Sequence, residues 1–234
     1  MGHKALGQLA LLSLAIAAPL VAQGGGMGGM RMGGNPTKKV EGTGDLPAGW
    51  MVRFDPVRGN QPAPTGKDIK FVAMGSGFHF TSGPAAIYYN PKDMATGEFG
   101  VSATFTNAAS LVHEAYGIFV GGHNLQDSTQ NYLYLVVKPA EGTFQIKHRT
   151  SNARPNPGEQ PTSSPAVNKE DASGKASNTL TIHVAKDTVH FMVNGKLVQA
   201  LAKSQLGGEP TDGQVGIRIN HNIDVHVDGF GIKK

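Results

Sequence analysis

The sequence predicts an all-β protein whose strands form two antiparallel sheets packed face to face, a sandwich or jelly roll. Three observations lead to this fold class. Apolar and polar residues alternate with period two in segment after segment, the pattern of strands that bury one face. The 234 residues include 32 glycines and 14 prolines, and turn residues of this kind bound the segments. No convincing amphipathic helix longer than two turns interrupts the pattern.

The N-terminal part of the chain precedes the strand pattern and divides into two segments. Residues 1–22 begin with a lysine-containing stretch, continue with an apolar run over 9–18, and end in the small residue Ala22, the layout of a secretory signal peptide. A membrane anchor is the alternative, but this run is shorter than the about 20 apolar residues of a spanning helix. Residues 23–49 are rich in glycine and are expected to form a flexible linker to a domain at 50–234.

The linker contains a small methionine cluster, formed by Met27, Met30 and Met32. Thioether sulfur is a soft ligand, so such a cluster could hold Cu(I) in an oxidising compartment. No nearby histidine or further methionine strengthens this hypothesis, and a low-complexity Gly/Met tract is the preferred interpretation.

The expected strands follow one another from Trp50 to the C-terminus. Each carries apolar residues at every second position, so each has one apolar face. Ten or more such strands require two sheets whose apolar faces pack together. The clearest segments with this pattern are 50–54, 99–106, 116–120, 133–137, 144–148, 180–184, 189–193, 215–219 and 223–227.

Two hairpins have a predictable register. With the turn at Lys186-Asp187, one strand pairs with the next so that Ile182 faces Phe191 inside and His183 faces His190 outside. With the turn at Ala140-Glu141, the inner pair is Leu135–Ile146 and the outer pairs are Tyr134–Lys147 and Tyr132–Arg149. The Pro/Ser-rich stretch between Thr150 and Asn178 is expected to be a surface loop over one rim.

Composition excludes several classes of protein. The chain has no cysteine, which rules out disulfides, thiolate nucleophiles and Cys-ligated zinc. Its net charge of +4 is spread along the sequence, whereas a nucleic-acid-binding protein would cluster Lys and Arg on one face. We therefore expect no nucleic-acid partner and, after signal cleavage, no stable membrane insertion.

A resemblance to a known fold family rests on the order of five segments. These are GEFGVSATFT, YGIFVGG, a hairpin ending in FMVNGK, then TDGQVGIRI and DVHVDGFGI. Together they resemble concanavalin A-like, laminin-G-type jelly rolls, and more narrowly exported bacterial domains of the 3-keto-disaccharide hydrolase type, over about residues 50–234. The resemblance implies a two-sheet jelly roll that acts on or binds carbohydrate. Two features depart from it: the Glu-x-Asp-x-x-Glu strand of the glucanases is missing, and the opening acidic-Gly segment is only LPAGWMVRFD.

The outer face of the second hairpin is the candidate binding site. Aromatic rings stack on sugar C–H surfaces, and Gln, Lys and Arg donate hydrogen bonds to hydroxyls. The alternative is a solvated hairpin held by cross-strand cation–π pairs. The candidate ligand-binding residues are Tyr132, Tyr134, Gln145, Lys147 and Arg149, with His123 and Asn131 on the adjoining loop.

No catalytic or metal-binding residue is assigned. Glycoside hydrolysis needs two carboxyl groups about 5–9.5 Å apart, and Glu98 and Glu114 are the pair to consider, although both are expected to mark strand starts facing solvent. His183, His190 and His226 lie on outward faces but lack an evident orienting carboxylate, so exposed sheet histidines are expected. His148 is expected to be a hydrogen-bonded strand-end histidine. No cofactor is expected, and Ca²⁺ bound by loop oxygens remains open without a named site.

These observations predict an exported, periplasmic or secreted module that binds carbohydrate or another cell-envelope polymer without catalysis. A glycoside-acting hydrolase of the 3-keto-disaccharide type is the alternative that the resemblance implies, so whether the protein is an enzyme stays open. A structural surface or assembly module is the second alternative.

Overall fold

The computed structural model describes residues 1, 40, 42–57, 59–108, 113–150 and 160–233. Within these residues the chain forms two antiparallel sheets of seven strands each, which confirms the predicted all-β sandwich. The helical elements of the described part are two short 3-10 turns, Gly66–Asp68 and Lys203–Leu206, and none of its helices is long and apolar enough to cross a membrane. The strands are β1 Met51–Phe54, β2 Ile69–Met74, β3 Gly77–Ser82, β4 Ala86–Ala95, β5 Phe99–Asn107, β6 Tyr116–His123, β7 Asn131–Lys138, β8 Thr143–Thr150, β9 Thr162–Ser163, β10 Ala176–Val184, β11 Thr188–Val193, β12 Lys196–Ala202, β13 Gly213–Ile219 and β14 Ile223–Lys233.

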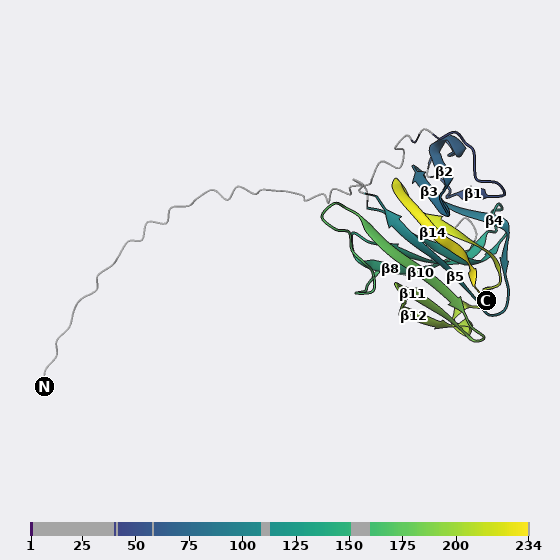
Figure 1. Ribbon diagram of the computed structural model, residues 1–234. Helices are drawn as coiled ribbons and strands as arrows, with labels where there is room; N and C mark the ends of the chain where they lie inside the picture. Colours follow the sequence, from purple (N-terminus) through teal and green to yellow (C-terminus); the bar gives the residue numbers. More distant parts are fainter. Residues whose placement is uncertain (2–39, 41, 58, 109–112, 151–159, 234) are drawn as a thin grey trace. The chain divides into compact units, whose positions relative to one another are not determined.

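The two sheets interleave distant parts of the chain. Sheet A has the strand order β1-β4-β13-β6-β7-β8-β9, and sheet B has the order β12-β11-β10-β5-β14-β3-β2. Figure 1 shows β14, β5 and β10 of sheet B side by side. The last two strands belong to different sheets, since β13 lies between β4 and β6 while β14 lies between β5 and β3. The short turn between β13 and β14 therefore connects the two layers.

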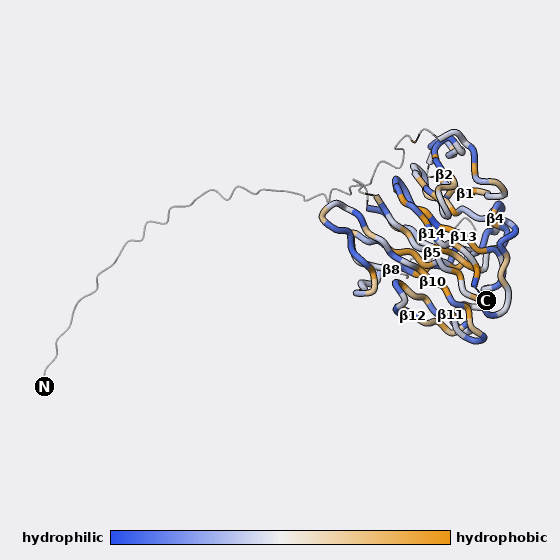
Figure 2. Tube along the Cα trace, in the orientation of Figure 1, coloured by the Kyte–Doolittle hydropathy of each residue, from blue (hydrophilic) through white to orange (hydrophobic). Residues whose placement is uncertain are grey.

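The main core lies between the sheets. Figure 2 shows hydrophobic and hydrophilic residues alternating along the strands, as the period-two pattern predicted. Burial of these inward side chains is the chief stabilising contribution to the fold. The largest of them that are fully buried in this core are Tyr88, Tyr116, Phe71, Phe80, Phe105, Phe191, Ile118, Leu135 and Leu180.

Both predicted hairpin registers are confirmed. In β10 and β11, Ile182 lies opposite Phe191 and His183 opposite His190. In β7 and β8, the pairs are Leu135–Ile146, Tyr134–Lys147 and Tyr132–Arg149. Because the side-chain period of a strand is two, these pairings also place each residue on its predicted face.

The N-terminal predictions fall mostly outside the described residues. The predicted signal peptide, the methionine cluster and most of the linker lie within residues 2–39. At the end of the predicted linker, Val40 is buried, the Gly42 amide donates to the Lys67 carbonyl, and Leu46 packs against the core. The folded body thus includes residues that precede Trp50.

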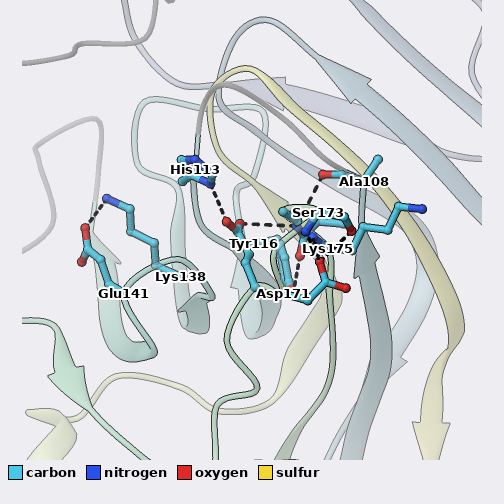
Figure 3. Close-up of polar contacts among 11 residues, drawn as sticks. Ala108, His113, Tyr116, Lys138, Glu141, Asp171, Ser173 and Lys175 are labelled. Carbon is cyan, nitrogen blue, oxygen red and sulfur yellow. Dashed lines mark hydrogen bonds and ion pairs between the residues drawn. The ribbon is translucent and has the colours of Figure 1, made fainter.

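The Pro/Ser-rich stretch is more than a surface excursion. Residues 151–159 lie outside the described part, but after them β9 pairs with β8, and Ala166 and Val167 are buried in the core. The following turn is ordered by Asp171, whose carboxylate accepts hydrogen bonds from the Ser173 and Lys175 amides at 2.8 and 3.1 Å (Figure 3). Residues 160–175 are therefore mostly exposed, as expected of a surface loop, but Ala166 and Val167 anchor them in the core.

Gly216 in β13 is a position where only hydrogen fits. A Cβ there would clash with the Phe119 ring and the Tyr88 carbonyl oxygen. We expect Gly216→Ala to lower the free energy of unfolding by about 1–3 kcal/mol, because overpacking forces the neighbours to shift. Urea denaturation measures the change, and Gly231→Ala is the matched control, since nothing lies within 4 Å of a Cβ at Gly231. Equal effects at the two glycines would contradict this account.

Candidate functional site

The outer face of sheet A carries the candidate residues. Directly opposite residues in an antiparallel sheet share a face. One row across the sheet is Met51, Tyr89, Gly216, Phe119, Tyr134 and Lys147. Tyr132 and Arg149 pair with each other two residues away from Tyr134 and Lys147, so they lie on this same face.

The tyrosines of this face are buried. Tyr132 and Tyr134 have exposed fractions of 0% and 3%, so the expectation of an exposed aromatic platform on this hairpin is wrong. They belong to a second apolar cluster, in which the ring centroids of Phe119 and Tyr132 are 5.2 Å apart and those of Tyr132 and Tyr134 are 5.3 Å apart. Burial raises the pKa of both tyrosine hydroxyls, which therefore stay protonated.

Two arginines and one aspartate form an ion cluster above these rings, here called the Asp55 cluster: Asp55, Arg149 and Arg218. Arg218 donates to both carboxylate oxygens of Asp55, Nη1 to Oδ1 at 2.6 Å and Nη2 to Oδ2 at 2.7 Å. Arg149 adds a third bond, Nη2 to Oδ2 at 3.0 Å. The Arg218 guanidinium carbon lies 5.9 Å from the Tyr134 ring centroid, and both arginine side chains are 5% exposed.

The Asp55 cluster reveals the shape of the face. Asp55 directly follows β1, whereas Arg149 is in β8, five strand positions away in sheet A. Neighbouring strands are about 4.8 Å apart, so these two backbones would be about 24 Å apart in a flat sheet. A 3.0 Å contact can close only if the outer face is concave around it.

The electrostatics of the cluster keep Asp55 ionised. Burial by itself would raise the pKa of this carboxyl, but the charges and hydrogen bonds of Arg218, with the charge of Arg149, lower it to about 2. Asp55 is therefore a poor proton donor at neutral pH. One carboxylate facing two guanidinium groups leaves the cluster with a net charge of +1.

The other predicted site residues have different positions. Gln145 and Lys147 are half-buried on the same outer face. His123 is not on it: it lies opposite Asn131, which shares a face with the inward residue Leu133, and its Nε2 donates to the Asp212 carbonyl at 2.8 Å. The structure therefore brings the β7–β8 residues together and leaves His123 at the rim.

An open depression adjoins the buried cluster, here called the Tyr89 depression. Its volume is about 440 Å³. Tyr89 and Leu125, which also belong to the buried outer-face cluster, form part of its wall. Gln126 fixes the loop between β6 and β7 to this face, because its Nε2 donates to the Tyr89 hydroxyl at 3.0 Å and to the Val52 carbonyl at 3.1 Å. The residues that line the depression are Met51, Tyr89, Pro91, Asn124, Leu125, Gln126, Asp127 and Gln214.

Sequence reasoning missed Asp55, Arg218 and the depression. Asp55 stands between a strand and Pro56, where an acidic residue is an ordinary turn residue. Arg218 occupies an outward position in the VGIR segment that carried the family resemblance, and this was the available signal. No signal in the sequence indicated the Tyr89 depression, since its walls come from four separate segments.

The remaining candidates stay apart from this face. Glu98 and Glu114 lie just before β5 and β6, one exposed and one half-buried. His226 pairs with His79 of β3, on the far side of β5 from the His183–His190 pair. His148 interacts with the Asn131 side-chain oxygen at 3.0 Å, which confirms the predicted hydrogen-bonded histidine, and burial lowers its pKa. Within the described ranges no three His, Asp or Glu residues gather in a metal-ligand arrangement.

Comparison with known proteins supports the fold. No family model matches the sequence, and no curated protein matches it. Among solved structures, the carbohydrate binding module CBM66 from Bacillus subtilis aligns with a TM-score of 0.57 at 11% identity, over 80% of this chain and 96% of that one. A Bacillus subtilis protein of unknown function with a galectin-like fold aligns with a TM-score of 0.51 at 14% identity, over 79% and 88%. The predicted concanavalin A-like jelly roll is thereby confirmed.

Proposed function

We propose that this protein binds a carbohydrate polymer without cleaving it, and that the Tyr89 depression on the concave face of sheet A is the binding site. The observation that carries this proposal is the depression itself: an open hollow whose walls combine apolar surface with side-chain amides. Its volume of about 440 Å³ lies within the range of about 300–1,000 Å³ that is usual for ligand sites.

The lining suits a sugar. Met51 is 38% exposed and, with Pro91, offers apolar surface to the C–H face of a pyranose or furanose ring. Gln214 and Asn124 supply amide donors and acceptors for hydroxyl groups. A carbohydrate binding module is among the proteins of the same fold, which supports this ligand class.

Binding without hydrolysis is favoured by the state of two carboxylates, Asp55 in the ion cluster and Asp127 in the lining of the depression. A glycosidase needs a carboxylic acid with a raised pKa to protonate the leaving group. The pKa of Asp55 is lowered to about 2 by its arginines. Hydrogen bonds from the Thr129 amide, the Thr129 hydroxyl and the Ser128 hydroxyl lower the pKa of Asp127 as well. Neither carboxylate suits the role of proton donor.

We further propose that the ligand is met outside the cytoplasm. The predicted signal peptide at residues 1–22 supports this location, and a polymer of the cell envelope is an accessible ligand there. N-terminal sequencing of the protein recovered from the producing cell tests it, with cleavage near Ala22 as the expected result.

The test of binding replaces two residues that line the depression, Met51 and Gln214. We expect the double variant Met51→Ala/Gln214→Ala to bind an immobilised polysaccharide about tenfold more weakly, since it loses one apolar contact and one hydrogen-bonding group. Affinity electrophoresis of the full chain against a panel of plant, fungal and bacterial polysaccharides first identifies the ligand and then compares the variants.

The matched control is Met74→Ala/Gln199→Ala, which removes the same two residue types from exposed positions of sheet B. Retention unchanged in the Met51/Gln214 variant, or lost equally in the control, would refute the assignment of the site. Release of reducing sugar from the retained polymer would instead support a hydrolase. No retention on any polymer would favour a structural module.

A further inference from the structure

The outer face of sheet B holds a pair of histidines that the proposed function does not use. His183 of β10 and His190 of β11 lie directly opposite each other. Their Nδ1 atoms are 3.5 Å apart, and their rings are nearly parallel, with an interplanar angle of 12° and centroids 5.7 Å apart. Two residues separate each histidine from the Lys186-Asp187 turn, so the register of the pair is held by the turn and by the flanking strands.

The separation of these two nitrogens is close to that of a metal chelate. A metal–imidazole bond is about 2.0–2.1 Å long, so two nitrogens on one metal at angles between square and tetrahedral are about 2.9–3.4 Å apart. The observed 3.5 Å lies just above this range. When both rings carry their proton on Nε2, both Nδ1 lone pairs are free to bind.

The surface above the pair is open. In the row across the sheet, the residue beyond His183 is Gly100 and the residue beyond His190 is Ala200. Neither neighbour has a side chain that reaches over the rings, so water or an external ligand has room to complete a coordination shell.

A second histidine pair on the same sheet shows the contrast. His79 and His226 also lie opposite each other, but His79 Nε2 is 3.0 Å from Asp224, and His226 Nε2 is 3.2 Å from Asp228. Each of these imidazoles is already engaged by a carboxylate. Among the residues that the structure describes, His183 and His190 have no carboxylate in ion-pair contact and contact each other instead.

We propose that His183 and His190 form a two-histidine site for a divalent transition metal, with Cu(II) bound most tightly. Imidazole nitrogen suits Cu(II), Ni(II) and Zn(II), and the affinity of a given site generally rises to a maximum at Cu(II). Two protein ligands leave the remaining positions to solvent. The site therefore exchanges its metal readily, and it is independent of carbohydrate binding on sheet A.

The test is a titration of the full chain with Cu(II) sulfate in a non-coordinating buffer, followed by isothermal calorimetry and electron paramagnetic resonance. No reductant is added, because the methionines of residues 23–34 favour Cu(I). We expect the wild type to bind one more Cu(II) ion than His183→Gln or His190→Gln, or to bind that ion at least about tenfold more tightly. The electron paramagnetic resonance spectrum of this additional Cu(II) ion in the wild type should show hyperfine coupling to two nitrogen atoms.

His79→Gln is the matched control, since it also removes one histidine from a pair on sheet B. It should bind Cu(II) as the wild type does, and metal-free melting curves of all three variants should establish that each is folded. The proposal is overturned if His183→Gln and His190→Gln bind Cu(II) like the wild type, or if His79→Gln loses the same ion.

Discussion

Replacement of Asp55 by alanine is expected to lower the free energy of unfolding by about 3–5 kcal/mol, the usual cost of removing one partner from a buried ion pair. Arg149 and Arg218 are each 5% exposed and share this single carboxylate. Without Asp55 the buried Arg218 guanidinium loses the carboxylate that accepts two of its hydrogen bonds. Urea denaturation followed by tryptophan fluorescence measures the loss.

A surface ion pair provides the control for this prediction. Asp228→Ala removes a carboxylate that is 49% exposed and pairs with His226, and the expected change is about 0–1 kcal/mol. The double variant Asp55→Ala/Arg218→Met should recover part of the stability lost in Asp55→Ala, because it also removes the buried guanidinium that has lost its carboxylate. If Asp55→Ala costs no more than Asp228→Ala, the Asp55 cluster has no role in stabilising the concave face.

The Asp55 cluster also predicts how stability depends on pH. The pKa of Asp55 is about 2 in the folded protein against an ordinary value of 3.8. A carboxyl whose pKa is lower in the folded state contributes stability above its unfolded pKa, and that contribution is lost as the pH falls toward the folded pKa. Wild-type stability should therefore lose about 2 kcal/mol from this group between about pH 4 and pH 2. The Asp55→Asn variant should lack this component. If the free energy of unfolding falls equally between pH 4 and pH 2 in both proteins, the lowered pKa of Asp55 is contradicted.

Replacement of Asn178 by alanine is the second large effect, about 2–4 kcal/mol, because Asn178 is fully buried and forms four hydrogen bonds. Its side-chain oxygen accepts from the Asn168 amide at 2.8 Å and from the Asn194 side chain at 2.9 Å. Its amide group donates to the Asn168 carbonyl at 3.0 Å and to the Tyr116 hydroxyl at 3.3 Å. These bonds fasten the segment after residue 160 to the strands β6 and β10.

Two further variants separate this network from the general effect of mutation on β10. Ser177→Ala changes the exposed neighbour of Asn178 and should cost little. Tyr116→Phe removes one hydroxyl and should cost about 1 kcal/mol. Hydrogen exchange gives a second readout, since amides of residues 164–175 should exchange faster in Asn178→Ala than in either control. If Asn178→Ala lowers stability without faster exchange in residues 164–175, its hydrogen bonds do not hold this segment.

The sequence by itself determined the fold class, the two hairpin registers and the inward face of the strands that it predicted, whereas β2, β3, β4, β9 and β12 were not among them. All three follow from local rules: the side-chain period of a strand is two, and the turn sets which residues pair. His148 was correctly interpreted for the same reason, because its position among the inward residues of β8 required a hydrogen-bond partner.

The tertiary structure alone decided which residues of the outer face are accessible. Alternation assigned Tyr132 and Tyr134 to that face but carried no information on what covers it, and both rings are buried in the outer-face apolar cluster. Arg149 was predicted as a ligand donor, whereas it donates to Asp55, a residue 94 positions away in the chain. Asp55 and Arg218 are separated by 163 residues, and the Tyr89 depression joins four segments. Contacts of this kind depend on how distant strands are brought together. The alternation of apolar and polar residues along a single strand carries no information on this arrangement.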